Sequence, residues 1–247
     1  MILFTNIILV AIDIGDIMGE HFAEDYSLIM GIVDLIPVIL FTLAGCIIIK
    51  VMFNVLKKPF AVMLCSGVTL SLTAGLFKAI WKILLSLNIC DFYPFNVMFM
   101  PTQSLGFVLI GVGLISLLFN KKKDNENLVA VSALPLFSLV VLATPAKQVD
   151  GSVAFIAMLV IGEIMIATTL CFLAVKNKKW LCLVLFIISF IGLIIMGAMK
   201  PLSTKMNLTV TAANWIEEAV NIIAQATLLM GCYLLNKIGF FHYKETK

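Results

Sequence analysis

The sequence predicts an all-α, polytopic integral membrane protein with seven transmembrane helices. Of its 247 residues, 62% are hydrophobic and only 13% are charged, which leaves no soluble domain of ordinary size. Long apolar segments recur along the chain, each close to or above the ~20 residues that a spanning helix needs. Lysines cluster after every second segment and are rare in the alternate loops. These three observations together favour a bundle that crosses a membrane repeatedly.

Each predicted helix ends where charge, asparagine or proline interrupts the apolar run. The segments are Leu28–Val55, Phe60–Leu87, Phe95–Phe119, Leu128–Pro145, Ser152–Val175, Trp180–Met199 and Thr209–Leu235. Lys57, Lys58 and Pro59 separate the first from the second, and a charged loop at 120–127 separates the third from the fourth. No internal repeat or second domain is evident, so residues 28–236 are predicted to form one membrane domain.

The distribution of lysines predicts the orientation. Lys57 and Lys58, Lys121 to Lys123, Lys176 to Lys179 and the tail from Lys237 to Lys247 fall on one side, against Lys147, Lys200 and Lys205 on the other. By the positive-inside rule, the N-terminus lies outside and residues 237–247 form a basic cytoplasmic tail. We expect a plasma or cytoplasmic membrane. The net charge of +3 marks this boundary with anionic headgroups and does not indicate nucleic-acid binding.

The first 27 residues leave two readings open. Met1–Ile12 is apolar but too short to span, and an acidic stretch from Asp13 to Asp25 follows it. Residues 1–27 are therefore expected outside the membrane, as an amphipathic surface helix or as a lid over the mouth of the bundle. With Asp34, they make the outer face negative.

Metal and cofactor sites are not predicted. Five of the six cysteines fall inside predicted helices, there is no C-x-x-C pair, and His21 and His242 are expected on opposite sides of the membrane.

Two lysines stand out in the second predicted helix. Lys78 lies ~27 Å up a ~30 Å apolar core, and Lys82 lies at the outer interface. Both share a stripe with Gly67, Ser71 and Gly75, and small residues typically face other helices. The stripe predicts that Lys78 points inward. The alternative is that both lysines snorkel to the headgroups.

The last predicted helix carries a polar stripe, and a polar residue in each of two other helices lies at similar depth. The stripe consists of Asn214, Glu217, Glu218, Asn221 and Gln225 at helical spacing. It is interpreted as a wall of a hydrated cavity or as a structural polar seam. Gln103 follows the helix-distorting Pro101, and Glu163 is the only charged residue in its span, so it must be paired, hydrated or protonated.

Together these residues predict a polar pocket that opens outward between the second, third, fifth and seventh helices. Lys78 and Lys82 would face Glu163, Glu217 and Glu218, which leaves one negative charge in excess. A cationic ligand, Na⁺ or a proton would balance it.

A transporter or ligand-binding protein for a small polar or amphiphilic molecule is the leading functional hypothesis, with Glu163 or Glu218 coupling transport to H⁺ or Na⁺. The first alternative is a seven-helix receptor or partner-binding module, which would bind a small molecule or lipid outside and a membrane-protein partner. The second is an enzyme acting on lipid headgroups, with Glu217 and Glu218 as acid and base. Glu217-Glu218 resembles the di-glutamate of intramembrane prenyl-protein proteases, but Ile222 replaces that motif's arginine, so no family is assigned.

Overall fold

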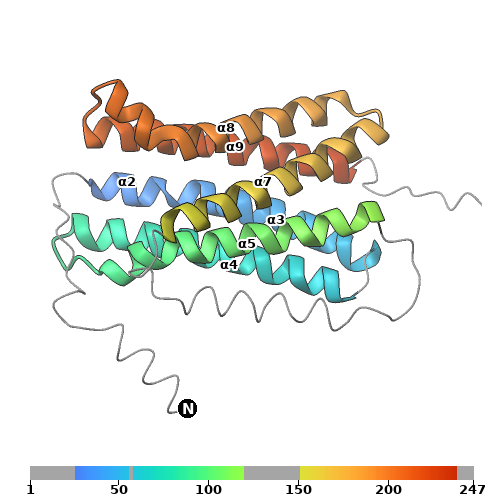
Figure 1. Ribbon diagram of the computed structural model, residues 1–247, viewed down its shortest axis with the longest axis horizontal. Coiled ribbons are helices and arrows are strands. Elements are labelled where there is room, and N and C mark those ends of the chain that lie inside the picture. The colour runs from blue at the N-terminus through green and yellow to red at the C-terminus, as the bar shows by residue number, and fades with distance from the viewer. Residues whose placement is uncertain (1–25, 56–57, 120–150, 238–247) are drawn as a thin grey trace, which may run out of the picture.

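The computed structural model describes residues 26–55, 58–119 and 151–237, and all regular secondary structure within them is helical (Figure 1). The helices are α2 (Leu28–Val33), α3 (Leu35–Val55), α4 (Lys58–Ser86), α5 (Tyr93–Phe119), α7 (Gly151–Lys176), α8 (Trp180–Lys205) and α9 (Val210–Lys237).

Six stretches of these helices are long and apolar enough to cross a membrane. They are Leu28–Asn54, Pro59–Ser86, Tyr93–Leu118, Phe155–Lys176, Trp180–Met199 and Val210–Lys237. They coincide with six of the predicted spans, and their length and composition indicate a multi-pass membrane protein. The predicted span Leu128–Pro145 lies outside the described residues, as do residues 1–25 and 238–247.

The first predicted span is interrupted at Asp34, which separates α2 from α3. Pro37 explains the interruption, because its nitrogen carries no hydrogen to donate to the carbonyl of Val33 and its ring crowds that carbonyl. The N–H of Asp34 closes α2 by donating to Met30 O at 3.0 Å. A carboxylate is thereby placed at a helix break inside the bundle.

Two helix ends carry asparagine in a left-handed conformation. α4 ends before Asn88 (φ 55°) and α8 before Asn207 (φ 51°). Asparagine tolerates this region better than most residues, and it allows later N–H groups to bond the last carbonyls of the helix. Ile89 N accordingly donates to Leu84 O at 3.1 Å, and Leu208 N to Ser203 O at 3.0 Å. α8 therefore extends past its predicted end at Met199.

The six long helices form a closed ring in the order α3, α4, α5, α7, α8 and α9, with α9 returning to α3, and α2 packs against α4 (Figure 1). Glycines allow close approach within this ring. A Cβ on Gly67 of α4 would lie 2.6 Å from Gly106 O, and one on Gly162 of α7 would lie 2.7 Å from Val108 N of α5. Small residues at such contacts are typical of membrane helix packing.

α5 and α7 run parallel. Gly162 packs against Phe107 and Val108, whereas Met165, further along α7, packs against Gly111, further along α5. Figure 1 shows both helices running in the same direction. Phe119, which ends α5, and Gly151, which begins α7, consequently lie at opposite ends of the bundle.

The two halves of the bundle differ in character. Apolar side chains from all six long helices pack together in one half, around Met52, Leu64, Leu114, Ala174 and Leu235. This half lies toward the last turns of α3, α5, α7 and α9, where Lys176 and Lys237 stand. Asp34, Lys82 and Glu218 are buried toward the other end of the bundle. The interior is thus polar toward one end and closed by apolar side chains toward the other.

Candidate functional site

Three charged side chains form a buried cluster, which we call the ion triad: Asp34, Lys82 and Glu218. Lys82 Nζ lies 2.7 Å from Asp34 Oδ2 and 2.9 Å from Glu218 Oε1. The ammonium donates a hydrogen bond to Glu218, whereas its contact with Asp34 lacks hydrogen-bond directionality. All three residues are at most 4% exposed. One ammonium is therefore held between two carboxylates away from solvent.

A second ion pair lies beside the triad but is more open. Lys78 Nζ donates to Glu217 Oε1 at 3.4 Å, and the two side chains are 23% and 29% exposed. The same nitrogen lies 5.1 Å from the centre of the Phe99 ring, which suits a cation–π contact. The Lys78–Glu217 pair thus has a longer N–O distance and a larger solvent exposure than the contacts of the triad.

The helix repeat explains why there are two separate pairs. Lys78 and Lys82 are one helical turn apart on α4 and share a face. Glu217 and Glu218 are neighbours on α9, so their side chains project ~100° apart and reach different lysines. Glu217 and Glu218 therefore pair with different lysines.

Side-chain contacts hold the loop between α4 and α5 against the end of the bundle that contains the ion triad. Trp81 Nε1 donates to Asp91 Oδ1 at 2.6 Å, and both residues are buried. Tyr26 packs edge-on against the Trp81 ring, with ring centres 5.2 Å apart. Trp81 therefore anchors both the start of α2 and the α4–α5 loop next to Lys82.

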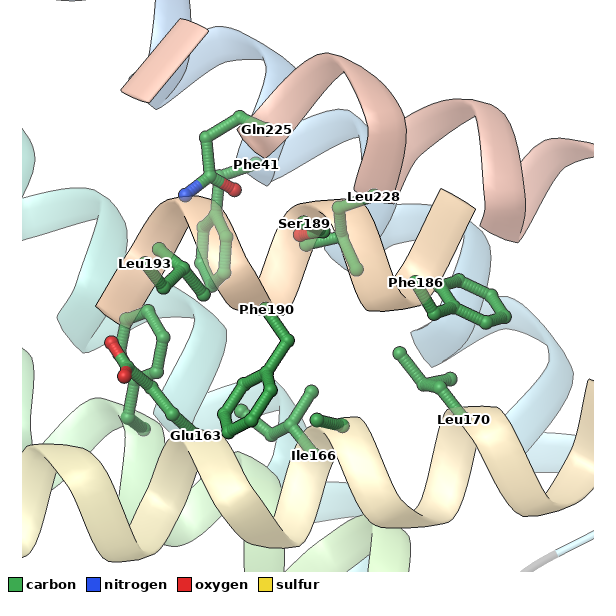
Figure 2. A pocket seen from close by; sticks show the side chains of 12 residues that line it. Phe41, Glu163, Ile166, Leu170, Phe186, Ser189, Phe190, Leu193, Gln225 and Leu228 are labelled. Carbon is green, nitrogen blue, oxygen red and sulfur yellow. The ribbon is translucent and has the colours of Figure 1, made fainter. Parts of the chain in front are cut away.

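A small cavity lies near the middle of the long helices (Figure 2). Its volume is about 30 Å³, and α3, α5, α7, α8 and α9 contribute to its lining. Most lining residues are apolar, and four are aromatic. The aromatic residues are Phe41, Phe107, Phe186 and Phe190, and the polar ones are Glu163, Ser189 and Gln225.

Of the described residues, Glu163 is the only acidic one that lines this cavity. It is 6% exposed, and no other described residue pairs with it through a hydrogen bond or an ion pair. Gln225 is 5% exposed; its Nε2 donates to Asn221 Oδ1 at 3.4 Å, while its buried Oε1 accepts from no donor in the described parts of the chain. Figure 2 shows the two side chains entering from α7 and α9. The Glu163 carboxylate and Gln225 Oε1 are thus hydrogen-bond acceptors at the cavity that lack a donor among the described residues.

The structure divides the predicted site residues into two groups. One contains Lys78, Lys82, Glu217 and Glu218, and the other contains Glu163, Asn221 and Gln225. Glu163 was expected near the lysines but lies in the second group. Gln103 and Asn214 are half-buried, and within the described parts of the chain no hydrogen bond or ion pair links them to either group.

Asp34 was missed as a site residue, because it was assigned to the acidic outer surface. Two features of the sequence signalled its burial: it follows the apolar residues Leu28–Val33, and Pro37 lies three residues later. Lys82 was expected at the interface, yet it is the more buried lysine. The carboxylate of Asp34 supplies the reason, since it draws the ammonium inward.

Comparisons with known proteins identify no relative. No protein-family model matches the chain, and neither curated proteins nor solved structures give a match.

Proposed function

We propose that the protein is a membrane transporter that binds a small cation carrying hydrogen-bond donors in the cavity beside Glu163. The carboxylate of Glu163 is the observation that carries the proposal. It is buried in the middle of a membrane-spanning helix, and the described residues offer it no cation. An uncompensated charge at such depth costs at least ~2.5–3.5 kcal/mol on insertion scales, so the site favours a positive ligand or a proton.

The cavity lining supports a cation with N–H donors. Glu163 supplies negative charge, and Gln225 Oε1 is a buried acceptor without a donor among the described residues. Buried acceptors that gain a donor recover hydrogen-bond energy that they otherwise lose. The rings of Phe41, Phe107 and Phe186 add faces on which cations bind favourably. A primary ammonium or a guanidinium group meets all three requirements.

The volume limits the size of the bound group. A single water needs roughly 10–15 Å³ of such space, so the cavity of about 30 Å³ holds about two water-sized groups. A methylammonium ion is of that size, and a larger solute would require the helices around the cavity to separate. When the cation leaves, a proton on Glu163 restores neutrality, and this exchange couples transport to H⁺.

We propose the seven-crossing topology together with this function. α5 and α7 are parallel, so the chain between Phe119 and Gly151 has to connect opposite ends of the bundle. The segment Leu128–Pro145 is apolar and close to the length of a span. The lysines at the ends of α7 and α9 favour a cytoplasmic location for that end. Fusions of a cytoplasmic and an extracytoplasmic reporter to the C-terminus test the orientation.

Uptake of ¹⁴C-labelled methylammonium by reconstituted proteoliposomes tests the transport proposal, because exchange of one cation for one proton moves no net charge and gives no steady current. Wild-type proteoliposomes should take up the label faster than protein-free liposomes, and this difference is the methylammonium signal. Excess unlabelled methylammonium should compete with this uptake, whereas tetramethylammonium, which lacks N–H donors and is larger than the cavity, should not; competition by NaCl tests Na⁺.

Glu163→Gln should abolish the methylammonium signal, since it removes the charge and keeps the shape. Thr168→Ala, at an exposed position on the same helix, should leave the signal intact. The proposal fails if folded wild-type protein gives no methylammonium signal, or if Glu163→Gln transports like the wild type.

A further inference from the structure

We propose that the ion triad is a proton-binding site, in which Asp34 and Glu218 share one proton beside the Lys82 ammonium. This site is separate from the cavity at Glu163 and goes beyond the transport proposal. With both carboxylates ionised, the triad would carry one net negative charge in a region where each residue is at most 4% exposed. One bound proton makes the triad neutral.

The geometry brings the two carboxylates together. Asp34 Oδ2 lies 2.7 Å and Glu218 Oε1 lies 2.9 Å from the same nitrogen, Lys82 Nζ. Carboxylates that share such a site repel each other when both are ionised, which favours protonation of one of them. The lysine offsets only one of the two charges.

An unpartnered buried oxygen provides an independent indication. Asp34 Oδ1 is buried and accepts no hydrogen bond from any described residue. A buried acceptor without a donor costs ~1–3 kcal/mol, and more when it is charged. A proton on the Asp34 carboxyl removes its charge and provides a donor. Protonation of Asp34 would thus account for the burial of Oδ1.

Among the residues that the structure describes, the surrounding charges do not neutralise the triad. On α4 and α9, Lys78 and Glu217 pair with each other at 3.4 Å and cancel in net charge. In the α4–α5 connection, Asp91 accepts from Trp81 Nε1. Lys205, near the end of α8, is exposed to solvent. Within the described parts of α3 and α5, no further charged residue lies at this end.

A proton suits the triad better than a metal ion. No group of three or more His, Cys, Asp or Glu side chains in the described chain is arranged to hold a metal. The ammonium of Lys82 also occupies the position between the carboxylates that a cation would take.

Infrared spectroscopy of the purified full-length protein tests the proposal, because a protonated carboxyl has a carbonyl stretch that shifts in D₂O. The measurement uses Glu163→Gln protein, which removes the carboxyl of the transport proposal. This protein should keep one such band near neutral pH. Asp34→Asn or Glu218→Gln in that background should each remove it, since one carboxylate paired with Lys82 is already neutral. Asp91→Asn, the same substitution at the same end, should retain it.

Two results would overturn the proposal. The first is the absence of a protonated-carboxyl band from folded Glu163→Gln protein. The second is a band that survives Asp34→Asn or Glu218→Gln. If those variants do not fold, ¹³C labelling of aspartate or glutamate carboxyls decides the matter in the unaltered triad, because the band must shift with at least one label. Loss of transport in Glu163→Gln has no bearing on these outcomes.

Discussion

Lys82→Met should destabilise the protein far more than Lys78→Met. Both substitutions remove an ammonium from the same face of α4, one helical turn apart, and replace it with an apolar chain of similar length. Lys82 Nζ contacts two buried carboxylates, whereas Lys78 makes one 3.4 Å pair with a half-exposed partner. The two variants therefore differ chiefly in burial and in the number of partners left behind.

The expected magnitudes follow from that difference. Removing one partner of a buried ion pair typically costs 3–5 kcal/mol, because the remaining charge stays buried. Lys82→Met leaves Asp34 and Glu218 without their ammonium, so we expect a loss of about 3–5 kcal/mol, limited by the uptake of a second proton. Exposed pairs contribute ~0.2–1 kcal/mol, so Lys78→Met should cost about 1 kcal/mol.

The free energy of unfolding can be measured in bicelles by steric trapping. The double variant Lys82→Met/Glu218→Gln should lose less than the sum of the two single variants, because the charges act on each other. Equal losses for Lys82→Met and Lys78→Met would refute the assignment of Lys82 to a buried triad. A loss below 1 kcal/mol for Lys82→Met would do the same.

Two further changes test the packing and the loop. Gly106→Val should disrupt the contact between α4 and α5, because its Cβ would lie 2.8 Å from the backbone oxygen of Gly67; Gly197→Ala is the neutral control, since nothing lies within 4 Å, and thermal unfolding distinguishes the two. Trp81→Phe keeps an aromatic ring but removes the indole N–H that donates to Asp91 Oδ1 at 2.6 Å, so it should cost ~1–3 kcal/mol and speed proteolysis of the α4–α5 loop. A loop as resistant as in the wild type would contradict the second expectation.

The sequence was sufficient to locate six spans, since apolar length and the residues that end each run are local properties. It also indicated that Lys78 and Glu218 face inward, because the helix repeat places them on stripes of small or polar residues. It could not indicate that Glu163 lies apart from the lysines. That separation depends on how α7 rotates against α5 and α8, and the nearly uniform apolar surface of α7 gives no periodic signal for its rotation.

Asp34 illustrates a second limit on predicting the site from the sequence. Its position in the chain suggested a surface acid, and only the break caused by Pro37 turns its carboxylate toward Lys82. The pairing joins residues far apart in the chain, as does the contact between Lys82 and Glu218, which are 136 positions apart. Partner choice at such separations is set by the packed bundle and not by local pattern.

The order of synthesis determines the order in which the three charged residues of the ion triad come together. Asp34 and Lys82 precede α9 in the chain and leave the ribosome before it, so they can enter the bilayer with their two charges paired. Glu218 lies on α9 and arrives after both of them, when α9 packs against α3. Its arrival converts a balanced pair into a cluster with a surplus of negative charge. A nascent chain that stops before α9 should therefore be stable as a paired intermediate, and completion of the bundle should coincide with the capture of a proton from the surrounding water.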